Sequence, residues 1–134
     1  MPETRRYGRM RLEVPSRSEW VGIVRLAVAG VASKLPFDDT QIDDLKLAAS
    51  EACALCVLQS DPGRPLIVEA AAEAGKFSLA VRGFPPTGKS PLSDEQRETL
   101  EAAEFVIRSV VDEAEIGNDG DGMYCLLSKT LTPR

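Results

Sequence analysis

The sequence predicts an α+β fold: a two-layer α/β sandwich in which helices cover one face of a mixed, mostly antiparallel sheet. Segments with strand or helix periodicity follow in the order strand, two helices, two strands, helix, two strands. No linker, repeat or low-complexity tract interrupts them, and 134 residues are enough to bury one core. We therefore expect one domain over residues 10–134, preceded by a flexible basic tail over residues 1–9.

The first strand and the first helix are predicted from prolines and a capping pattern. Residues 10–14 alternate as a strand does, and a proline closes them. Ser16 and Glu19 have the spacing of a capping box, so the first helix is expected to begin there and to reach about Lys34, before Pro36. Its predicted apolar face consists of Val21, Val24, Val28, Val31 and Leu35.

A second helix and two paired strands come next. The helix is expected to begin near residues 39–40, with Asp43 completing a second capping box, and to end near Gln59. After a turn that contains proline and glycine, residues 66–70 and 76–82 have the composition of paired strands.

The last third of the chain supplies another helix and a hairpin. Residues 83–91 form a proline-rich loop, and Ser93 with Gln96 caps the third helix. Residues 114–116 and 123–130 are expected to form a hairpin about a turn over residues 117–122. The predicted apolar face of the third helix consists of Leu100, Ala103, Ile107, Val110 and Val111.

Composition and charge exclude several classes of function. The net charge of −5 and pI near 4.8 oppose sequence-independent nucleic-acid binding, which needs a positive field. The arginines near the N-terminus precede no apolar run, so they do not indicate a signal peptide. No segment approaches the roughly 18 apolar residues of a membrane span. Three cysteines without a disulfide framework are typical of a reducing cytoplasm, where we expect this protein.

Five short segments share their pattern with a known family. They are 12–15 (LEVP), 19–26 (EWVGIVRL), 30–33 (GVAS), 42–48 (IDDLKLA) and 50–53 (SEAC). In this order they resemble the RsbW-type anti-sigma factors, from about residue 10 to 59 and, less closely, beyond. The resemblance implies the histidine-kinase-like ATPase (Bergerat) fold. It also implies the family's activity: serine kinases that sequester a stress or sporulation sigma factor and phosphorylate an anti-anti-sigma protein.

The chain departs from this family at the positions that bind ATP. The family's first nucleotide box carries Glu and, four residues later, Asn; here Glu51 keeps the general-base position and Leu55 replaces the metal-ligand amide. The second box should supply an Asp after a strand, but residues 82–86 read RGFPP. The glycine-rich third box corresponds to residues 100–105, LEAAEF, which continue a helix and add negative charge.

From these departures we predict a regulatory module with degenerate ATP-binding boxes that uses no cofactor and no metal. The alternative is an active anti-sigma serine/threonine kinase that binds Mg-ATP and phosphorylates an anti-anti-sigma antagonist. In that case substitute residues, such as Arg82 or Lys89, would contact the phosphates.

Residues 83–90 also match the phosphate-loop pattern G-x-x-x-x-G-K-[ST] and follow a predicted strand. Pro85 and Pro86 remove two of the backbone amides that this loop needs, and the next helix cap is Ser93. The order of elements lacks the parallel βα units of such domains. A surface loop is therefore the favoured interpretation.

Two metal-like patterns have structural explanations. Cys53 and Cys56 form C-x-x-C inside a helix, and with one distant Cys125 and no His a zinc site lacks its fourth ligand. Buried thiols are favoured over a redox pair. Residues 118–122 resemble a calcium loop without its distal Glu, so a hairpin turn is favoured.

The resemblance places partner contacts on the first helix and the residues before it. Arg25 occupies the charged position, and its guanidinium suits a partner carboxylate. Glu19 and Trp20 precede it, and Trp20 is either a partner anchor or a cap on the edge of the sheet. We expect these three residues to bind a sigma factor or an anti-anti-sigma protein, in a homodimer as in the family. The predicted function is an anti-sigma factor-like partner-switching module in transcription regulation during the stress response.

Overall fold

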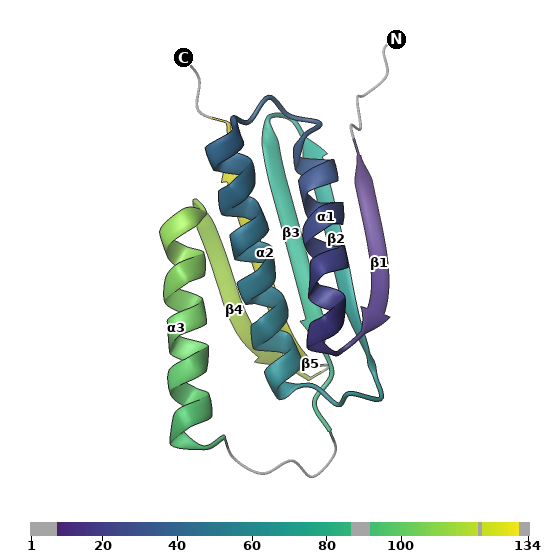
Figure 1. Cartoon of the computed structure of the whole chain (residues 1–134), viewed down its shortest axis with the longest axis vertical. Coiled ribbons are helices and arrows are strands. Elements are labelled where there is room, and N and C mark those ends of the chain that lie inside the picture. Colours follow the sequence, from purple (N-terminus) through teal and green to yellow (C-terminus); the bar gives the residue numbers. More distant parts are fainter. Residues whose placement is uncertain (1–7, 87–91, 121, 132–134) are drawn as a thin grey trace.

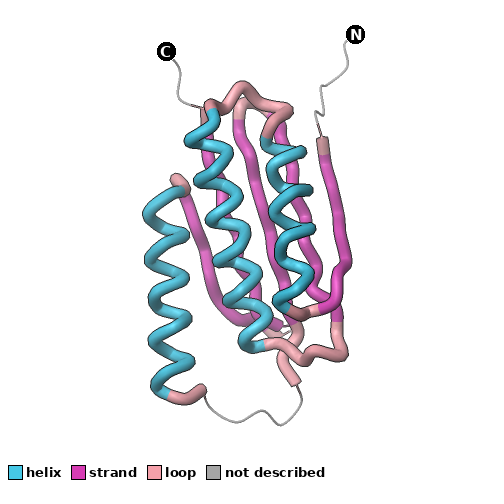
Figure 2. Tube along the Cα trace, viewed as in Figure 1, coloured by secondary structure: helices cyan, strands magenta, loops and turns pink. Residues whose placement is uncertain are grey.

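The computed structural model describes residues 8–86, 92–120 and 122–131, and its elements follow the predicted order. Three helices form one layer against one face of a five-stranded sheet, which confirms the two-layer α+β sandwich (Figures 1 and 2). The strands are β1 (Arg9–Pro15), β2 (Pro65–Glu73), β3 (Lys76–Gly83), β4 (Glu113–Asp119) and β5 (Gly122–Thr130). The helices are the 3-10 turn η1 (Ser18–Trp20), α1 (Val21–Ala32), α2 (Asp39–Gln59) and α3 (Asp94–Val110).

The sheet has the strand order β1-β2-β3-β5-β4, and every neighbouring pair is antiparallel. The expectation of a mixed sheet is therefore wrong for the described strands. After α3 the chain enters β4 in the same direction as β3, but β5 returns from β4 and inserts between the two. No parallel pair among the described strands is hydrogen-bonded as a result.

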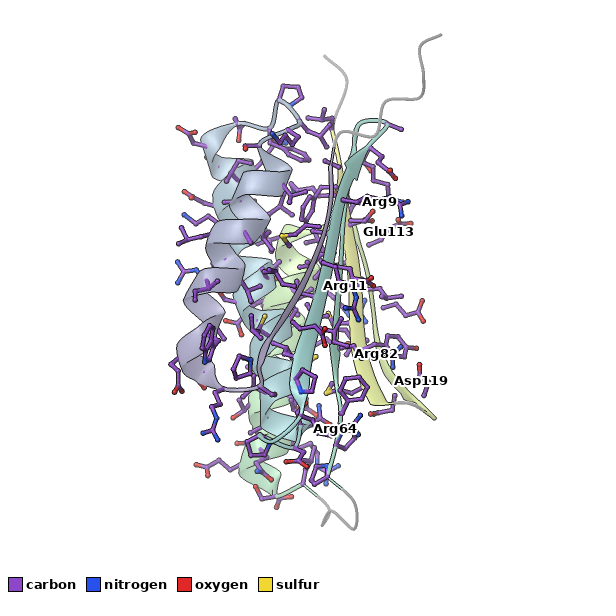
Figure 3. The ribbon with its side chains drawn as sticks, turned by 90° about the vertical axis from the view of Figure 1, so that its right-hand side faces the viewer. Arg9, Arg11, Arg64, Arg82, Glu113 and Asp119 are labelled. Carbon is purple, nitrogen blue, oxygen red and sulfur yellow. The ribbon has the colours of Figure 1, made fainter. Side chains whose placement is uncertain are left out.

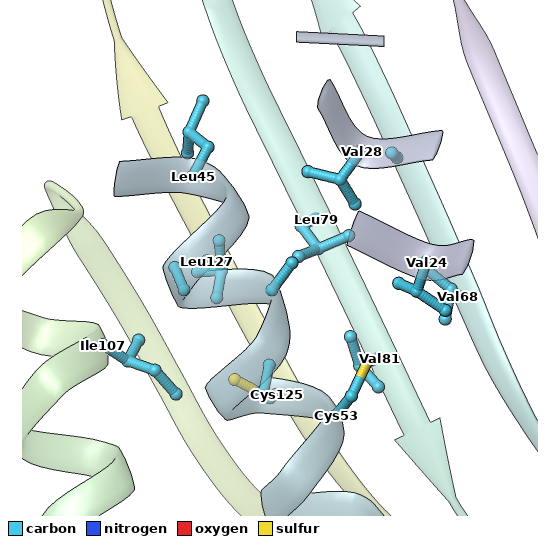
Figure 4. Close-up of a cluster of buried hydrophobic side chains, with 14 of the residues drawn as sticks. Val24, Val28, Leu45, Cys53, Val68, Leu79, Val81, Ile107, Cys125 and Leu127 are labelled. Carbon is cyan, nitrogen blue, oxygen red and sulfur yellow. The ribbon is translucent and has the colours of Figure 1, made fainter. Parts of the chain in front are cut away.

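The core lies between the helix layer and the inner face of the sheet. Strands β2 and β3 alternate buried and less buried residues, so that one face packs on the helices. Helix α1 contacts β2, α2 contacts β3 and β5, and α3 contacts β4. Burial of each large apolar side chain contributes about 1.5–3 kcal/mol. Figure 4 shows part of this cluster, including Val24, Leu45, Leu79, Ile107 and Leu127.

The predicted start of the first helix is wrong. Ser16 does not cap it: this residue is buried, and its hydroxyl has no hydrogen-bond partner among the described residues. The first turn is η1, whose N-cap Arg17 makes no side-chain capping bond, and α1 begins only at Val21. The chain leaves β1 at this point, and the burial of Ser16 in the bend turns its side chain away from the first helical amides.

The capping box of α2 lies earlier than predicted. Asp38 accepts a hydrogen bond from the Gln41 amide, and the Gln41 side chain accepts one from the Asp38 amide, so Asp43 plays no part. The same arrangement between Ser93 and Gln96 confirms the predicted start of α3. Both pairs satisfy amides that the first helical turn leaves without a partner.

The strands are longer than the sequence predicts. β1 includes Arg9, which the sequence-based boundary places in the tail; residues 1–7 of that tail lie outside the described residues. The β4–β5 pairing continues until Asp119 faces Gly122, so the six-residue turn predicted over 117–122 is wrong. Gly122 adopts a φ of 147°, a conformation that favours glycine and lets the pairing extend this far.

Candidate functional site

Leu55 belongs to the core. It is 2% exposed and lies on the buried stripe of α2 that faces the sheet. Glu51, one helical turn earlier, is half-buried. The isobutyl side chain of Leu55 has no atom that can ligate a metal ion, and it is buried in the core. The position at which RsbW-type proteins carry an amide ligand is thus used for packing.

Helix α3 occupies the segment that corresponds to the family's glycine-rich box. Residues 100–105 lie inside this helix, and Ala103 is buried in the core that α3 forms with α2. Amides in a helix interior donate to carbonyls four residues earlier and cannot also cradle phosphates. Glu104 forms an ion pair of 2.9 Å with Arg108, so this carboxylate serves the helix itself.

Arg82 lies on the open face of the sheet. Figure 3 shows it there with Asp119, on the side away from the helices, while Val81 and Gly83 face inward. The hydroxyl of Tyr124, whose ring lies 5.6 Å from the Arg82 guanidinium, donates a 3.0 Å bond to Glu115, which raises the pKa of Tyr124. Arg82 and Glu51 therefore lie on opposite sides of the sheet. Lys89, the other candidate for a phosphate contact, lies outside the described residues.

The described residues next to this segment oppose the phosphate-loop interpretation of residues 83–90, which the sequence already disfavours. Gly83 is the buried last residue of β3, and the next helix among the described residues begins at Asp94. The antiparallel sheet also lacks the parallel neighbour that a phosphate loop follows. Residues 87–91 of this segment lie outside the described part of the chain.

The three cysteines are buried, reduced thiols. Burial raises the pKa of Cys53 and of Cys125 to about 12, and it raises the pKa of Cys56 as well. A thiol held in its protonated form is a weak nucleophile and a poor metal ligand. Within residues 8–86, 92–120 and 122–131, no three His, Cys, Asp or Glu side chains are grouped as a metal site.

Of the three predicted partner-binding residues, Arg25 and Glu19 are exposed. Trp20 is half-buried against the core cluster, an arrangement that matches its interpretation as a structural cap. Arg25 lines a shallow groove of about 390 Å³ between α1 and α2, together with Asp43, Lys46, Leu47 and Ser50. Sequence reasoning missed the α2 side of this groove. The available signal was apolar Leu47, whose position is outside the buried stripe of α2.

A larger concavity of about 1060 Å³ lies on the open face of the sheet. Its centre is made of small side chains such as Ala71, Ser78 and Ala80. At its edge Arg9, which is labelled in Figure 3, forms an ion pair of 3.1 Å with Glu73. Arg11 pairs with Glu69 at 3.6 Å on the same face, so both arginines of β1 have acidic partners within the molecule.

These features define a class. A helix layer on an antiparallel sheet, with an acidic residue on the second helix and a long connection from β3 to α3, is the arrangement that the resemblance to the histidine-kinase-like ATPase fold implies. The sequence model of the histidine kinase-like ATPase domain matches residues 14–129, and the chain belongs to this family. None of the helices in the described part of the chain is both long and apolar enough to cross a membrane.

Part of the chain is similar to serine-protein kinases named RsbW. The protein of Bacillus pumilus (strain SAFR-032) is 40% identical over 55 residues, 41% of this chain and 34% of that protein. The protein of Bacillus subtilis (strain 168) is 46% identical over 48 residues, 36% of this chain and 30% of that protein. The chain thus matches about a third of the length of these relatives. These matches confirm the resemblance to the RsbW-type family.

Proposed function

We propose that this chain is an anti-sigma factor-like binding module that sequesters a sigma factor, or another component of the same switch, without binding ATP. The observation that carries the proposal is the burial of Leu55 at 2% exposure, where the family has a metal-ligand amide. The continuous helix through residues 100–105 supports it, because its amides are engaged within α3. Control would then depend on relative affinities and concentrations, with an antagonist competing for the module.

Partner binding is proposed for the exposed side of α1. Arg25 is exposed there and points into a groove with α2, and a guanidinium binds a carboxylate in two-point geometry. Glu19 is exposed one turn before α1. Trp20 supports the same surface indirectly, since its contact with the core fixes the start of α1.

One observation favours the second candidate, an active serine kinase that phosphorylates an anti-anti-sigma protein. Glu51 stands at the position that the resemblance assigns to the general base, and the relatives reported above are serine-protein kinases. A half-buried carboxylate can accept a proton from a hydroxyl once a nucleotide is held beside it.

Calorimetric titration with MgATP separates the two candidates. The proposed module gives no binding heat at millimolar nucleotide. Micromolar binding would overturn the proposal, and ATP-dependent phosphorylation of an anti-anti-sigma protein that is lost in Glu51→Ala would establish the kinase. Thermal unfolding of the unmodified chain and of Glu51→Ala shows whether the variant is folded. A titration with MgADP distinguishes loss of nucleotide binding from loss of a γ-phosphate contact.

The partner is tested by adding the purified chain to transcription reactions with each sigma factor of the source organism. One sigma factor is expected to be inhibited stoichiometrically, with a sharp end point and without ATP. Arg25→Glu is expected to raise the inhibitory concentration at least tenfold. The matched control is Arg97→Glu, an exposed arginine on α3, which α2 separates from α1 (Figure 1). The proposed function is contradicted if two results occur together. The chain inhibits no sigma factor, and the tagged chain recovers neither a sigma factor nor an anti-anti-sigma protein.

A further inference from the structure

The turn between β4 and β5 contains two Asp–Gly dipeptides. Asp119 precedes Gly120, and Asp121, which lies outside the described residues, precedes Gly122. In such a dipeptide the glycine nitrogen can attack the aspartate Cγ, because glycine has no Cβ atom to obstruct the approach. The product is isoaspartate, so this turn has the chemistry of a spontaneous covalent modification. The contacts of Asp119 determine how readily the first dipeptide reacts.

The reaction loses one water and then regains it. A bond forms between the Gly120 nitrogen and Asp119 Cγ, and the bond from Cγ to one carboxyl oxygen breaks. That oxygen leaves as water, with the carboxyl proton and the amide proton. Water then opens the imide: attack at Cγ restores aspartate, whereas attack at the main-chain carbonyl carbon gives isoaspartate, in which the backbone passes through Cγ. The mass of the chain is unchanged, and no oxidant or reductant is needed.

Three hydrogen bonds hold the Asp119 carboxylate that would be attacked. Arg82 donates one to each oxygen at 3.0 Å, and the Gly122 amide donates one to Oδ1 at 3.0 Å. Two-point pairing with a guanidinium fixes the plane of a carboxylate. It also holds the group as an anion, which reacts more slowly because it lacks the proton with which the oxygen leaves as water. The ion pair therefore opposes attack by the Gly120 nitrogen through both orientation and charge.

The backbone around this turn has little room for an altered linkage. Asp119 ends β4 and pairs with Gly122, the first residue of β5. Gly122 lies so close to Gly83 at the end of β3 that a Cβ atom on Gly122 would collide with the Gly83 carbonyl. Isoaspartate adds one backbone atom at residue 119 and moves its carboxylate from the side chain to Cα. The modification would therefore displace the turn and remove the partner of Arg82.

We propose that the Asp119–Gly120 bond is a site of isoaspartate formation and that Arg82 is the residue that suppresses the reaction. The side chains of Arg82 and Asp119 are 33% and 42% exposed, so solvent screens their ion pair and the protection is modest. We expect about fivefold, which corresponds to about 1 kcal/mol at tenfold per about 1.4 kcal/mol. The inference is independent of the proposed function and gives Arg82 a role in preserving the covalent structure of the turn.

The rate of isoaspartate formation at residue 119 tests the proposal. The full chain and its variants are incubated at neutral pH for several weeks, and isoaspartate is quantified with an isoaspartate-specific methyltransferase. Electron-transfer fragmentation then assigns the modification to residue 119 or residue 121. Arg82→Ala is expected to form isoaspartate at residue 119 about fivefold faster than the unmodified chain. The matched control is Arg11→Ala, which removes an arginine of the same open face that pairs with Glu69, and its rate is expected to be unchanged.

A second control separates the ion pair from general loss of stability. Asp38→Ala removes the capping bond from the Gln41 amide at the start of α2, at the other end of the molecule from the β4–β5 turn (Figure 1). Thermal unfolding shows that each variant is folded and how far it is destabilised. Asp38→Ala is expected to leave the rate at residue 119 unchanged. The proposal is overturned if Asp38→Ala accelerates the reaction as much as Arg82→Ala does, or if Arg82→Ala reacts at residue 119 no faster than the unmodified chain.

Discussion

The guanidinium of Arg82 donates two parallel hydrogen bonds of 3.0 Å each to the carboxylate of Asp119. The pair joins the end of β3 to the end of β4 across β5, where Tyr124 lies opposite Arg82 in the register. A two-point ion pair of this kind fixes the orientation of both side chains. It holds Arg82 on the open face of the sheet, remote from the helix that carries Glu51.

We predict that Arg82→Ala changes neither nucleotide titrations nor sigma-factor binding. The side chains of Arg82 and Asp119 are 33% and 42% exposed, so solvent screens the pair. A double-mutant cycle with Asp119→Ala is expected to give a coupling energy of no more than about 1 kcal/mol in urea unfolding. Detection of MgATP binding in the unmodified chain, and its loss in Arg82→Ala, would contradict this assignment.

Alanine substitutions of two serines near helix starts are predicted to have opposite effects on the free energy of unfolding. Ser93 caps α3 and receives a 3.1 Å bond from the Gln96 amide, so Ser93→Ala should lower the free energy of unfolding by about 1 kcal/mol. Ser16 is buried without a described partner, so Ser16→Ala should be neutral or stabilising, because it removes an unsatisfied hydroxyl. Urea midpoints of both variants measure the contrast. A comparable loss in Ser16→Ala would show that this hydroxyl has a partner.

The order of elements could be predicted because each local signal agreed with its neighbours. Periodicity, capping patterns and turn residues located the three α-helices and five strands of the described residues, and Ser93 with Gln96 is a complete capping signal. Ser16 and Glu19 match the same pattern, but the bend after β1 buries Ser16, and sequence spacing contains no information on such a bend. The strand pairing could not be predicted fully either. That β5 inserts between β3 and β4 depends on contacts far apart in the sequence.

Gly83 is predicted to tolerate alanine poorly. A Cβ atom there would collide with the Ser60 hydroxyl and approach the Cβ and carbonyl of Cys56 to 3.2 Å. Gly83→Ala should therefore separate β3 from the end of α2 and lower the free energy of unfolding by about 1–3 kcal/mol. Gly22→Ala, whose added methyl meets no atom, is the control and should raise stability. Equal stability of the two variants would contradict the packing described for Gly83.

The candidate site could be predicted only in part from the sequence. Aligning the chain to a family pattern identified Glu51 and Leu55 as neighbours on one helical face, and the structure adds that Leu55 points into the core. Arg82 was a reasonable phosphate contact by its position after a strand. Successive side chains of β3 point to opposite faces of the sheet. Val81 and Gly83 pack toward the helices, so Arg82 lies on the other face. The groove beside Arg25 needs two helices to form, and its one signal in the sequence is apolar Leu47, outside the buried stripe of α2.

The buried thiols are predicted to make the protein less stable in alkaline solution. The pKa of Cys53 and of Cys125 is raised from 9.0 to about 12, with burial as the largest cause. Above pH 9 the unfolded chain loses thiol protons that the folded chain retains, so the free energy of unfolding falls as pH rises toward 12. Each thiol contributes up to about 1.4 kcal/mol per pH unit in this window. Urea midpoints at pH 8, 9, 10 and 11 measure the slope.

Substitution separates the thiols from the lysines and tyrosines that also titrate at high pH. Cys125→Ala should lower stability at pH 8, because it leaves a cavity, but should make the decline above pH 9 less steep. The same burial predicts that 5,5′-dithiobis(2-nitrobenzoic acid) labels the native protein at pH 8 far more slowly than the urea-unfolded chain, since the thiolate is the reactive form. Rapid labelling of native thiols, or an unchanged slope in Cys125→Ala, would mean that these cysteines are more accessible than their position between α2 and the sheet allows. Slow labelling would identify them as packing residues, in keeping with a domain whose second helix is committed to its core from Leu45 to Cys56.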